Sequence, residues 1–213
     1  PREEKITSLV SVDSFDNNCY LLMLTRAGFI KRTALSAFSK IRSNGLIAIN
    51  LENGDALTWV RLSKEGDSVL IGSRTGMTIH FRLDLNELRP LGRTARGVKS
   101  MNLKSGDNLV SMDVLKSDLV DQIAKLEILD NENDIELENH PSRGPWVLVA
   151  SAFGLGKRVP VTQFRLQKRA GRGLRAIKFR IKDDFMVGLK VLGEGEELLF
   201  VTEKGVIVRT NAD

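Results

Sequence analysis

Short apolar runs separated by glycine-containing turns recur along the chain and predict β-hairpins. In four places a run rich in Val, Ile, Leu and Phe is followed by three turn residues, a glycine and a second such run. These glycines are Gly28, Gly76, Gly154 and Gly205. Glycine suits such a turn because it adopts positive φ without a Cβ clash. Helix-like periodicity is absent over most of the chain, so the pattern predicts an all-β protein.

The spacing of the hairpins indicates an internal repeat of about 50 residues. The turn glycines lie 48, 78 and 51 residues apart, and the long step equals one unit plus about 30 residues. After each full hairpin a loop of variable length leads to a second glycine, which is Gly45, Gly97 or Gly173, and then to two more apolar runs. Four-stranded units of this length in tandem are typical of propeller blades.

The repeat predicts one array of blades over residues 1–213. Residues 4–15 have the pattern of the last strand of a preceding blade. Either they complete the partial last unit, or they and that unit are incomplete blades at the two ends of a fragment. The predicted units cover residues 18–66, 67–115 and 145–192, with a partial blade over 193–213.

Acidic charge is concentrated in one segment, and basic charge is spread over the repeats. Residues 116–140 hold eight Asp or Glu against two Lys, so the formal charge of +5 leaves about +11 on the rest of the chain. We interpret residues 116–141 as an acidic insertion into the repeat. A basic excess in the ordered body favours a polyanion as partner.

The loop between the second and third strands of each unit carries most of the candidate binding residues. Because the units repeat, we expect these loops on one edge of the array. Arg and Lys beside glycine suit phosphate contacts, which hold duplex DNA without reading its sequence, and the low aromatic content (6%) argues against base stacking. The candidate DNA contacts are Lys40, Arg42, Arg89, Arg93, Arg96, Arg165, Gln167, Lys168, Arg169, Arg172 and Arg175 in the loops, with Arg32 and Arg158 four residues after a hairpin glycine.

Candidates for catalysis and metal binding are few. The two histidines, His80 and His140, and the single cysteine have no spacing typical of zinc. Asp55, Asp107 and Asp184 recur in three units, where aspartate closes a turn on its own backbone. We therefore expect no catalytic residue, metal or cofactor in this chain. No apolar segment is long enough to cross a bilayer, so no membrane partner is expected, and the lone cysteine fits a reducing compartment.

Two units, TRAGFIKRTALSAFSKIRSNGLIAINLENGD and LRPLGRTARGVKSMNLKSGDNLVSMDVL, resemble the repeats of the C-terminal domain of the DNA gyrase A subunit. The resemblance implies a β-pinwheel, a propeller-like disc whose blades exchange strands and whose basic rim wraps duplex DNA. It also implies a non-catalytic domain of a type IIA topoisomerase, with the catalytic tyrosine, ATP and Mg on other parts of a heterotetramer of the gyrase A and B subunits. A bacterial cytoplasm is the implied location, or a chloroplast or mitochondrion if the source is a plant.

Two alternatives to this interpretation remain. The C-terminal domain of the topoisomerase IV A subunit shares the blade pattern. From the residues alone, a propeller-like scaffold that binds acidic proteins is also consistent with the charge.

The segment QKRAGRG resembles the seven-residue box of the gyrase family, Gln-Arg-Arg-Gly-Gly-Lys-Gly, which wrapping and supercoiling require. It lies in the third full unit, whereas the family's box belongs to the first blade, and Ala170 adopts positive φ only at a cost. The segment is therefore either the family's box or a copy in a later blade. The identical positions are Gln167, Arg169, Gly171 and Gly173, and Lys168 and Arg172 keep the positive charge.

Overall fold

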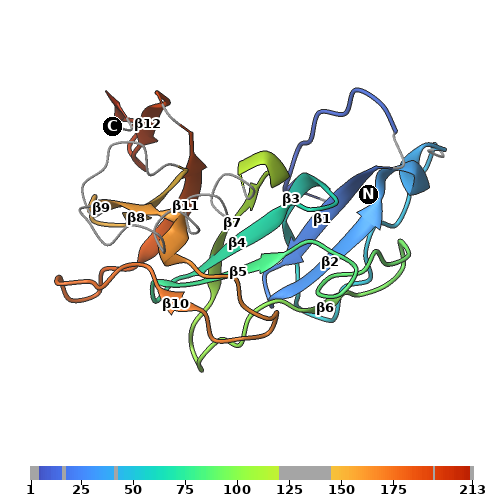
Figure 1. Cartoon of the computed structure of the whole chain (residues 1–213), viewed down its shortest axis with the longest axis horizontal. Helices are drawn as coiled ribbons and strands as arrows, with labels where there is room; N and C mark the ends of the chain where they lie inside the picture. The colour runs from blue at the N-terminus through green and yellow to red at the C-terminus, as the bar shows by residue number, and fades with distance from the viewer. Residues whose placement is uncertain (1–4, 16–17, 41–42, 120–144, 194, 212–213) are drawn as a thin grey trace, which may run out of the picture.

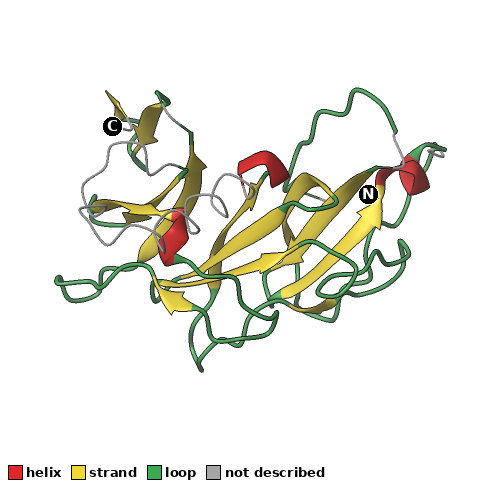
Figure 2. Ribbon diagram, in the orientation of Figure 1, coloured by secondary structure: helices red, strands yellow, loops and turns green. Residues whose placement is uncertain are grey.

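β-Sheets lying side by side form the framework of the molecule, as Figures 1 and 2 show. Arg42 and nearly all of the acidic insertion predicted over 116–141 lie outside the part of the chain that the structure describes. This computed structural model describes residues 5–15, 18–40, 43–119, 145–193 and 195–211.

The first two sheets share one strand order, and every neighbouring pair is antiparallel. The third sheet lacks the outermost strand, and the last is a hairpin. A short 3₁₀ helix follows the hairpin in the first and third units: η1 (Leu35–Phe38) and η3 (Val161–Gln163). The sheets are β3 (Leu57–Lys64), β1 (Cys19–Thr25), β2 (Phe29–Ala34) and β6 (Val98–Lys99); β7 (Leu109–Leu115), β4 (Ser68–Ser73), β5 (Met77–Arg82) and β10 (Leu174–Arg175); β11 (Met186–Leu192), β8 (Trp146–Ser151) and β9 (Gly156–Pro160); and β12 (Glu197–Val201) with β13 (Ile207–Asn211).

The outermost strand of each four-stranded sheet comes from the following unit. β6 pairs with β2, with Val98 opposite Ile30, and β10 pairs with β5, with Leu174 opposite Thr78. The exchange of strands between neighbouring blades, which the resemblance implied, is therefore confirmed. The apolar runs predicted as third strands are shorter than expected, and residues 45–52 form no strand. Such a run becomes a strand only where it reaches the open edge of a preceding hairpin.

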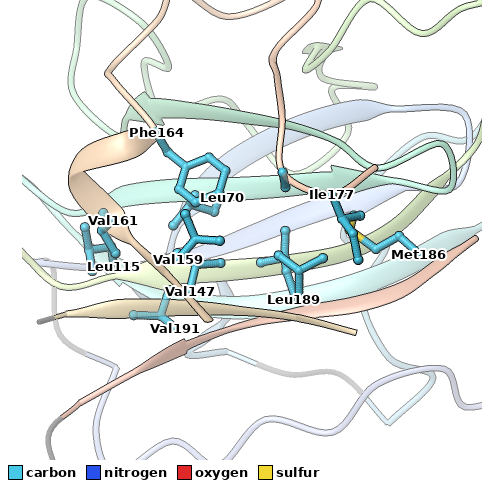
Figure 3. Close-up of a cluster of buried hydrophobic side chains, with 12 residues drawn as sticks. Leu70, Leu115, Val147, Val159, Val161, Phe164, Ile177, Met186, Leu189 and Val191 are labelled. Atoms are coloured by element: carbon cyan, nitrogen blue, oxygen red, sulfur yellow. The ribbon is translucent and has the colours of Figure 1, made fainter. Parts of the chain in front are cut away.

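Neighbouring sheets pack face to face through apolar side chains. Successive residues of a strand point to opposite faces, so β4 contributes to two cores. Val69 and Ile71 join the core shared with the first sheet, and Leu70 joins the core shared with the third. Figure 3 shows the second core, where Leu70 lies among Val147 and Leu189. Burial on both faces fixes the middle blade between its neighbours.

The hairpin turns have the backbone that the glycine pattern predicted, since all four turn glycines have positive φ. The recurring aspartates close their own turns, as expected, and each also reaches the hairpin turn of its unit. There its Oδ1 accepts a backbone N–H from Ala27, Thr75 or Phe153 at 2.9, 3.0 or 3.1 Å. The carboxylates thus join the two turns at the same end of each sheet.

The last hairpin differs from the other blades. β12 and β13 form a two-stranded sheet, and most of its residues are exposed. Residues 5–15 form no strand in the described structure.

Candidate nucleic-acid interface

The long loops of the second and third units lie at the outer edge of the sheets. The strands β3, β7 and β11 are innermost, and β7 contacts both of the others, whereas β6 and β10 are outermost. Residues 83–97 lead into β6, and residues 164–173 lead into β10 (Figure 1). We call these two segments the rim loops. The expected placement of the variable loops on one edge agrees with this arrangement.

Several of the predicted DNA contacts have no side-chain partner among the residues that the structure describes. Within the described ranges, their side chains make no hydrogen bond or ion pair. Most are exposed, and Arg93 is half-buried. A guanidinium or ammonium group in this state is available to a phosphate oxygen at little cost in lost contacts. These side chains are Lys40, Arg89, Arg93, Arg165, Lys168, Arg172 and Arg175.

The QKRAGRG segment is attached to the preceding unit through its backbone. Gln167 N–H donates to the carbonyl of His80, and Ala170 N–H donates to the carbonyl of Ser100, both at 2.8 Å. Asn102 N–H donates in turn to the carbonyl of Gly171 at 2.8 Å. Ala170 has φ of 62°, so this loop holds an alanine in the left-handed region that favours glycine.

Arg169 and Gln167, two of the predicted DNA contacts, point into the protein instead of away from it. Arg169 Nε donates to the carbonyl of Glu87 at 3.1 Å, and its Nη1 donates to the carbonyl of Lys99 at 2.8 Å. The Arg169 N–H also donates to Glu87 Oε2 at 2.8 Å. Gln167 is half-buried, and its Oε1 is buried without a hydrogen-bond partner. The Arg169 side chain and the Gln167 backbone N–H thus hold the loop that exposes Lys168 and Arg172.

Arg96 is on the rim, but its charge is already partnered. Its guanidinium pairs with Glu52 and lies over the ring of Phe29, 4.3 Å from the ring centre. Any phosphate would compete with Glu52 for this side chain.

The expectation that Arg32 lies on an accessible surface is wrong. Its side chain is completely buried. Nε and Nη1 donate to the carbonyls of Leu88 and Leu83 at 2.8 and 2.6 Å, and Nη1 also pairs with Glu65 at 2.8 Å. The sequence shows only a basic residue on a strand, because the carbonyls that enclose it come from the following unit.

Arg158 occupies the same position of its hairpin as Arg32 and His80. It is exposed in this structure, and its guanidinium lies over the Trp146 ring at 4.4 Å. In the first two units this position contacts the loop of the next unit.

Sequence patterns did not reveal Lys31, which is the only other fully buried cation in the described residues. Its Nζ donates to the carbonyls of Ala48, Gly92 and Ala95 at 2.6, 3.0 and 3.1 Å, and also to that of Arg93. Burial and the nearby Arg93 guanidinium lower the pKa of Lys31 to about 8. The available signal was a Lys-Arg pair inside an otherwise apolar strand.

His80 is a buried side chain whose two ring nitrogens are both hydrogen-bonded within the protein. Burial lowers the pKa of His80, although its bond to the Phe164 carbonyl opposes the shift. Nδ1 donates to that carbonyl at 2.7 Å, and Nε2 accepts from Ser68 Oγ at 2.7 Å. In the described part of the chain, no group of three or more His, Cys, Asp or Glu is placed to hold a metal ion. No helix among these residues is long and apolar enough to span a membrane.

The repeats match a known family, described as DNA gyrase C-terminal domain, beta-propeller, over residues 20–64, 67–116, 145–192 and 196–213. The chain is 55% identical to the DNA gyrase A subunit of Synechocystis sp., over all of this chain and 26% of that protein. It is 37% identical to the chloroplastic/mitochondrial DNA gyrase A subunit of Arabidopsis thaliana, over 97% of this chain and 22% of that protein. The chain therefore spans about a quarter of the length of these relatives.

Solved structures support the same architecture. The C-terminal domain of DNA topoisomerase IV superposes with a TM-score of 0.76 at 26% identity, covering 98% of this chain and 57% of that one. A DNA gyrase A C-terminal domain gives a TM-score of 0.71 at 24% identity, covering 94% of this chain and 58% of that one, and supports the fold alone.

Proposed function

Because this chain belongs to the family of DNA gyrase C-terminal domains, we propose that it binds, bends and wraps duplex DNA without reading its sequence. The duplex would follow the outer edges of successive sheets. The observation that supports this proposal most strongly is the set of cations on the rim loops and β10 whose side chains have no partner among the described residues.

The spacing of charge in the structure suits a polyanion better than a single anion. Lys168, Arg172 and Arg175 come from the third unit but lie on the edge of the second sheet, because β10 pairs with β5. Arg89 and Arg93 of the second unit lie beside the first sheet in the same way. Cations thus recur from one blade to the next. A rigid series of cations makes backbone contacts that hold and bend DNA at many sequences.

Salt dependence of DNA affinity tests this interface. Each phosphate that the protein neutralises on B-DNA lowers log K by about 0.9 for each unit increase in log salt concentration. The Lys168→Ala, Arg172→Ala, Arg175→Ala triple variant should therefore bind more weakly, with a slope smaller by about 2.7. Arg169 is left intact because its guanidinium holds the loop.

A matched control removes three exposed lysines away from the rim loops: Lys64 on β3, Lys104 in a turn and Lys204 in the β12–β13 turn. The control loses the same net charge but should keep most of the salt slope. Equal loss in both triple variants would mean that net charge, and not the rim, carries DNA binding. Absence of DNA binding by the wild-type chain at moderate salt would instead favour the scaffold that binds acidic proteins.

The wider role follows from the same proposal. Wrapping by this domain would present a second duplex segment to the rest of the gyrase A subunit, and the B subunit would supply ATP hydrolysis for negative supercoiling. The chain itself would need no cofactor. The bacterial and chloroplastic/mitochondrial relatives fit a bacterial cytoplasm or a plant organelle as the location.

The topoisomerase IV alternative is favoured by one observation, the TM-score of 0.76 to the domain of that enzyme. The 55% identity to a gyrase A subunit favours gyrase. Complementation separates the two functions: the gyrase A subunit of the Synechocystis relative, with its C-terminal repeats replaced by this chain, should retain ATP-dependent negative supercoiling. Decatenation without supercoiling would support the alternative.

A further inference from the structure

Two neighbouring cations of β2, Lys31 and Arg32, are buried against the rim loop of the following unit. Both side chains are fully buried, and neither exposes its charge to solvent. Their partners are 51 to 64 residues away in sequence, except for Ala48 and Glu65. The contacts therefore join two units instead of stabilising one hairpin.

The two side chains hold the loop from opposite faces of one strand, because successive residues of a strand point in opposite directions. Lys31 Nζ donates to the carbonyls of Gly92, Arg93 and Ala95. Arg32 donates to the carbonyls of Leu83 and Leu88 on the other face. Between these contacts, the Leu91 N–H donates to the carbonyl of Arg32 at 2.8 Å. The loop is thus wrapped around the open edge of β2 beyond its pairing with β6.

This attachment matters because the loop has little structure of its own. Residues 83–97 contain only turns, and loops of this length are uncommon without function or anchoring. Asp84 closes the first turn by accepting the N–H groups of Asn86 and Glu87. The part that carries Arg89 and Arg93 depends on contacts to β2.

We propose that Lys31 is a positioning residue for DNA binding, whose buried ammonium group holds the 92–95 backbone so that Arg89 and Arg93 lie on the rim. Among the described residues no carboxylate contacts this ammonium group, so the carbonyl oxygens of two units supply the partial negative charge around it. The effect on DNA rests on the proposed function, whereas the attachment of the loop does not.

The hairpin of the second unit, which holds the third unit's loop, has no lysine at the position of Lys31. Ile79 occupies the position of Lys31, and His80 occupies that of Arg32. There the rim loop is held by His80 and by Arg169 from the loop itself. Arg169 bonds Glu87, which lies beside Leu88 in the part of the second unit's loop that Arg32 holds. Loss of Lys31 should therefore release the 92–95 part of that loop and leave the third unit's loop in place.

The test uses Lys31→Met, which keeps the length of the side chain and removes its donors. Lys104→Met is the control, since it removes one exposed lysine from the second unit, which also carries the 83–97 loop. In native conditions trypsin should cleave after Arg93 and Arg96 at least tenfold faster in Lys31→Met than in wild type or the control. Cleavage after Lys168 and Arg172 should not change. Peptide mass spectrometry identifies the sites.

DNA binding provides the second measurement. If Arg89 and Arg93 no longer meet phosphates, the salt slope of log K should fall by about 1.8 in Lys31→Met and by less in the control. An unchanged cleavage rate overturns the positioning role, whatever DNA does. Faster cleavage with an unchanged slope overturns its link to DNA. Wild-type protein that fails to bind DNA rejects the proposed function and leaves the cleavage test valid.

A second variant covers the case in which Lys31→Met does not fold cooperatively. Lys31→Gln keeps two donors, and it should give cleavage intermediate between wild type and full release. Hydrogen exchange of the wild-type chain adds a measurement without substitution, in which the Leu91 N–H should exchange slowly. Fast exchange at this amide would contradict the proposed attachment.

Discussion

Replacing Gly173 with alanine tests how closely the exchanged strand packs against the preceding blade. A Cβ on Gly173 would lie 2.6 Å from the carbonyl oxygen of Thr78 and 2.9 Å from Met101 Cε. The Thr78 carbonyl belongs to β5, the partner of β10, and has little freedom to move. Gly173 also has φ of 75°. Alanine therefore meets both a backbone penalty and a steric one.

The two penalties can be separated by a series of glycine substitutions. Gly106 has φ of 79° but no atom near its Cβ position, and Gly188 has open space without a positive φ. Gly106→Ala should cost about 1–2 kcal/mol, the usual cost of the left-handed region for a residue with Cβ. Gly188→Ala should be neutral or stabilising by up to about 1 kcal/mol, because alanine restricts the unfolded chain.

Gly173→Ala should cost about 2–5 kcal/mol, since overpacking adds about 1–3 kcal/mol to the backbone term. Urea unfolding of the three variants, followed by circular dichroism, gives the changes in free energy. The order of stability should be Gly188→Ala, then Gly106→Ala, then Gly173→Ala. If Gly173→Ala is no less stable than Gly106→Ala, the close contact between β10 and β5 is refuted.

Substitutions at three further positions probe other contacts. Ala170→Gly should stabilise the chain by about 0.5–1 kcal/mol in urea unfolding, because φ is 62° there; a loss of stability would contradict this. Asp113 is nearly buried on β7, and its Oδ2 accepts from Lys190 Nζ and Val191 N–H on β11. Asp113→Ala should cost about 1–3 kcal/mol, and Asp113→Asn, which still accepts one bond, should cost less; equal losses would argue against the backbone bond. Burial first, and then Arg93, lower the pKa of Lys31 from 10.5 to about 8, so the unfolded chain holds more protons between these values. Wild-type stability should thus rise by up to about 3 kcal/mol relative to Lys31→Met as pH rises through this window, and a constant difference would refute the shift.

Features set by neighbouring residues could be predicted from the sequence. The hairpins, their glycines and the repeat follow from local patterns, because a turn glycine and two apolar runs define a hairpin without reference to the rest of the chain. The role of the recurring turn aspartates, Asp55, Asp107 and Asp184, could also be predicted from the local sequence. The loop that carries Lys168 and Arg172 could be placed on the same edge as the loops of the other units, because the repeat implies one geometry for every unit.

Features set by contacts between units could not be predicted from the residues alone. The run that contains β6 has the same apolar pattern whichever sheet it joins, and only its resemblance to a family implied exchange. Arg32 and Arg169 read as exposed cations because their carbonyl partners lie 51 to 82 residues away in sequence. A buried cation that binds carbonyls has no local signature, so its role depends on the fold.

DNA bending by the rim tests the central claim most directly. A duplex of about 60 base pairs with a fluorophore at each end is nearly straight when free, because it is shorter than the persistence length of about 150 base pairs. Binding of the wild-type chain should bring the ends together and raise energy transfer. The Lys168→Ala, Arg172→Ala, Arg175→Ala variant should give little increase. Wild-type protein that saturates the duplex without raising energy transfer would contradict the account.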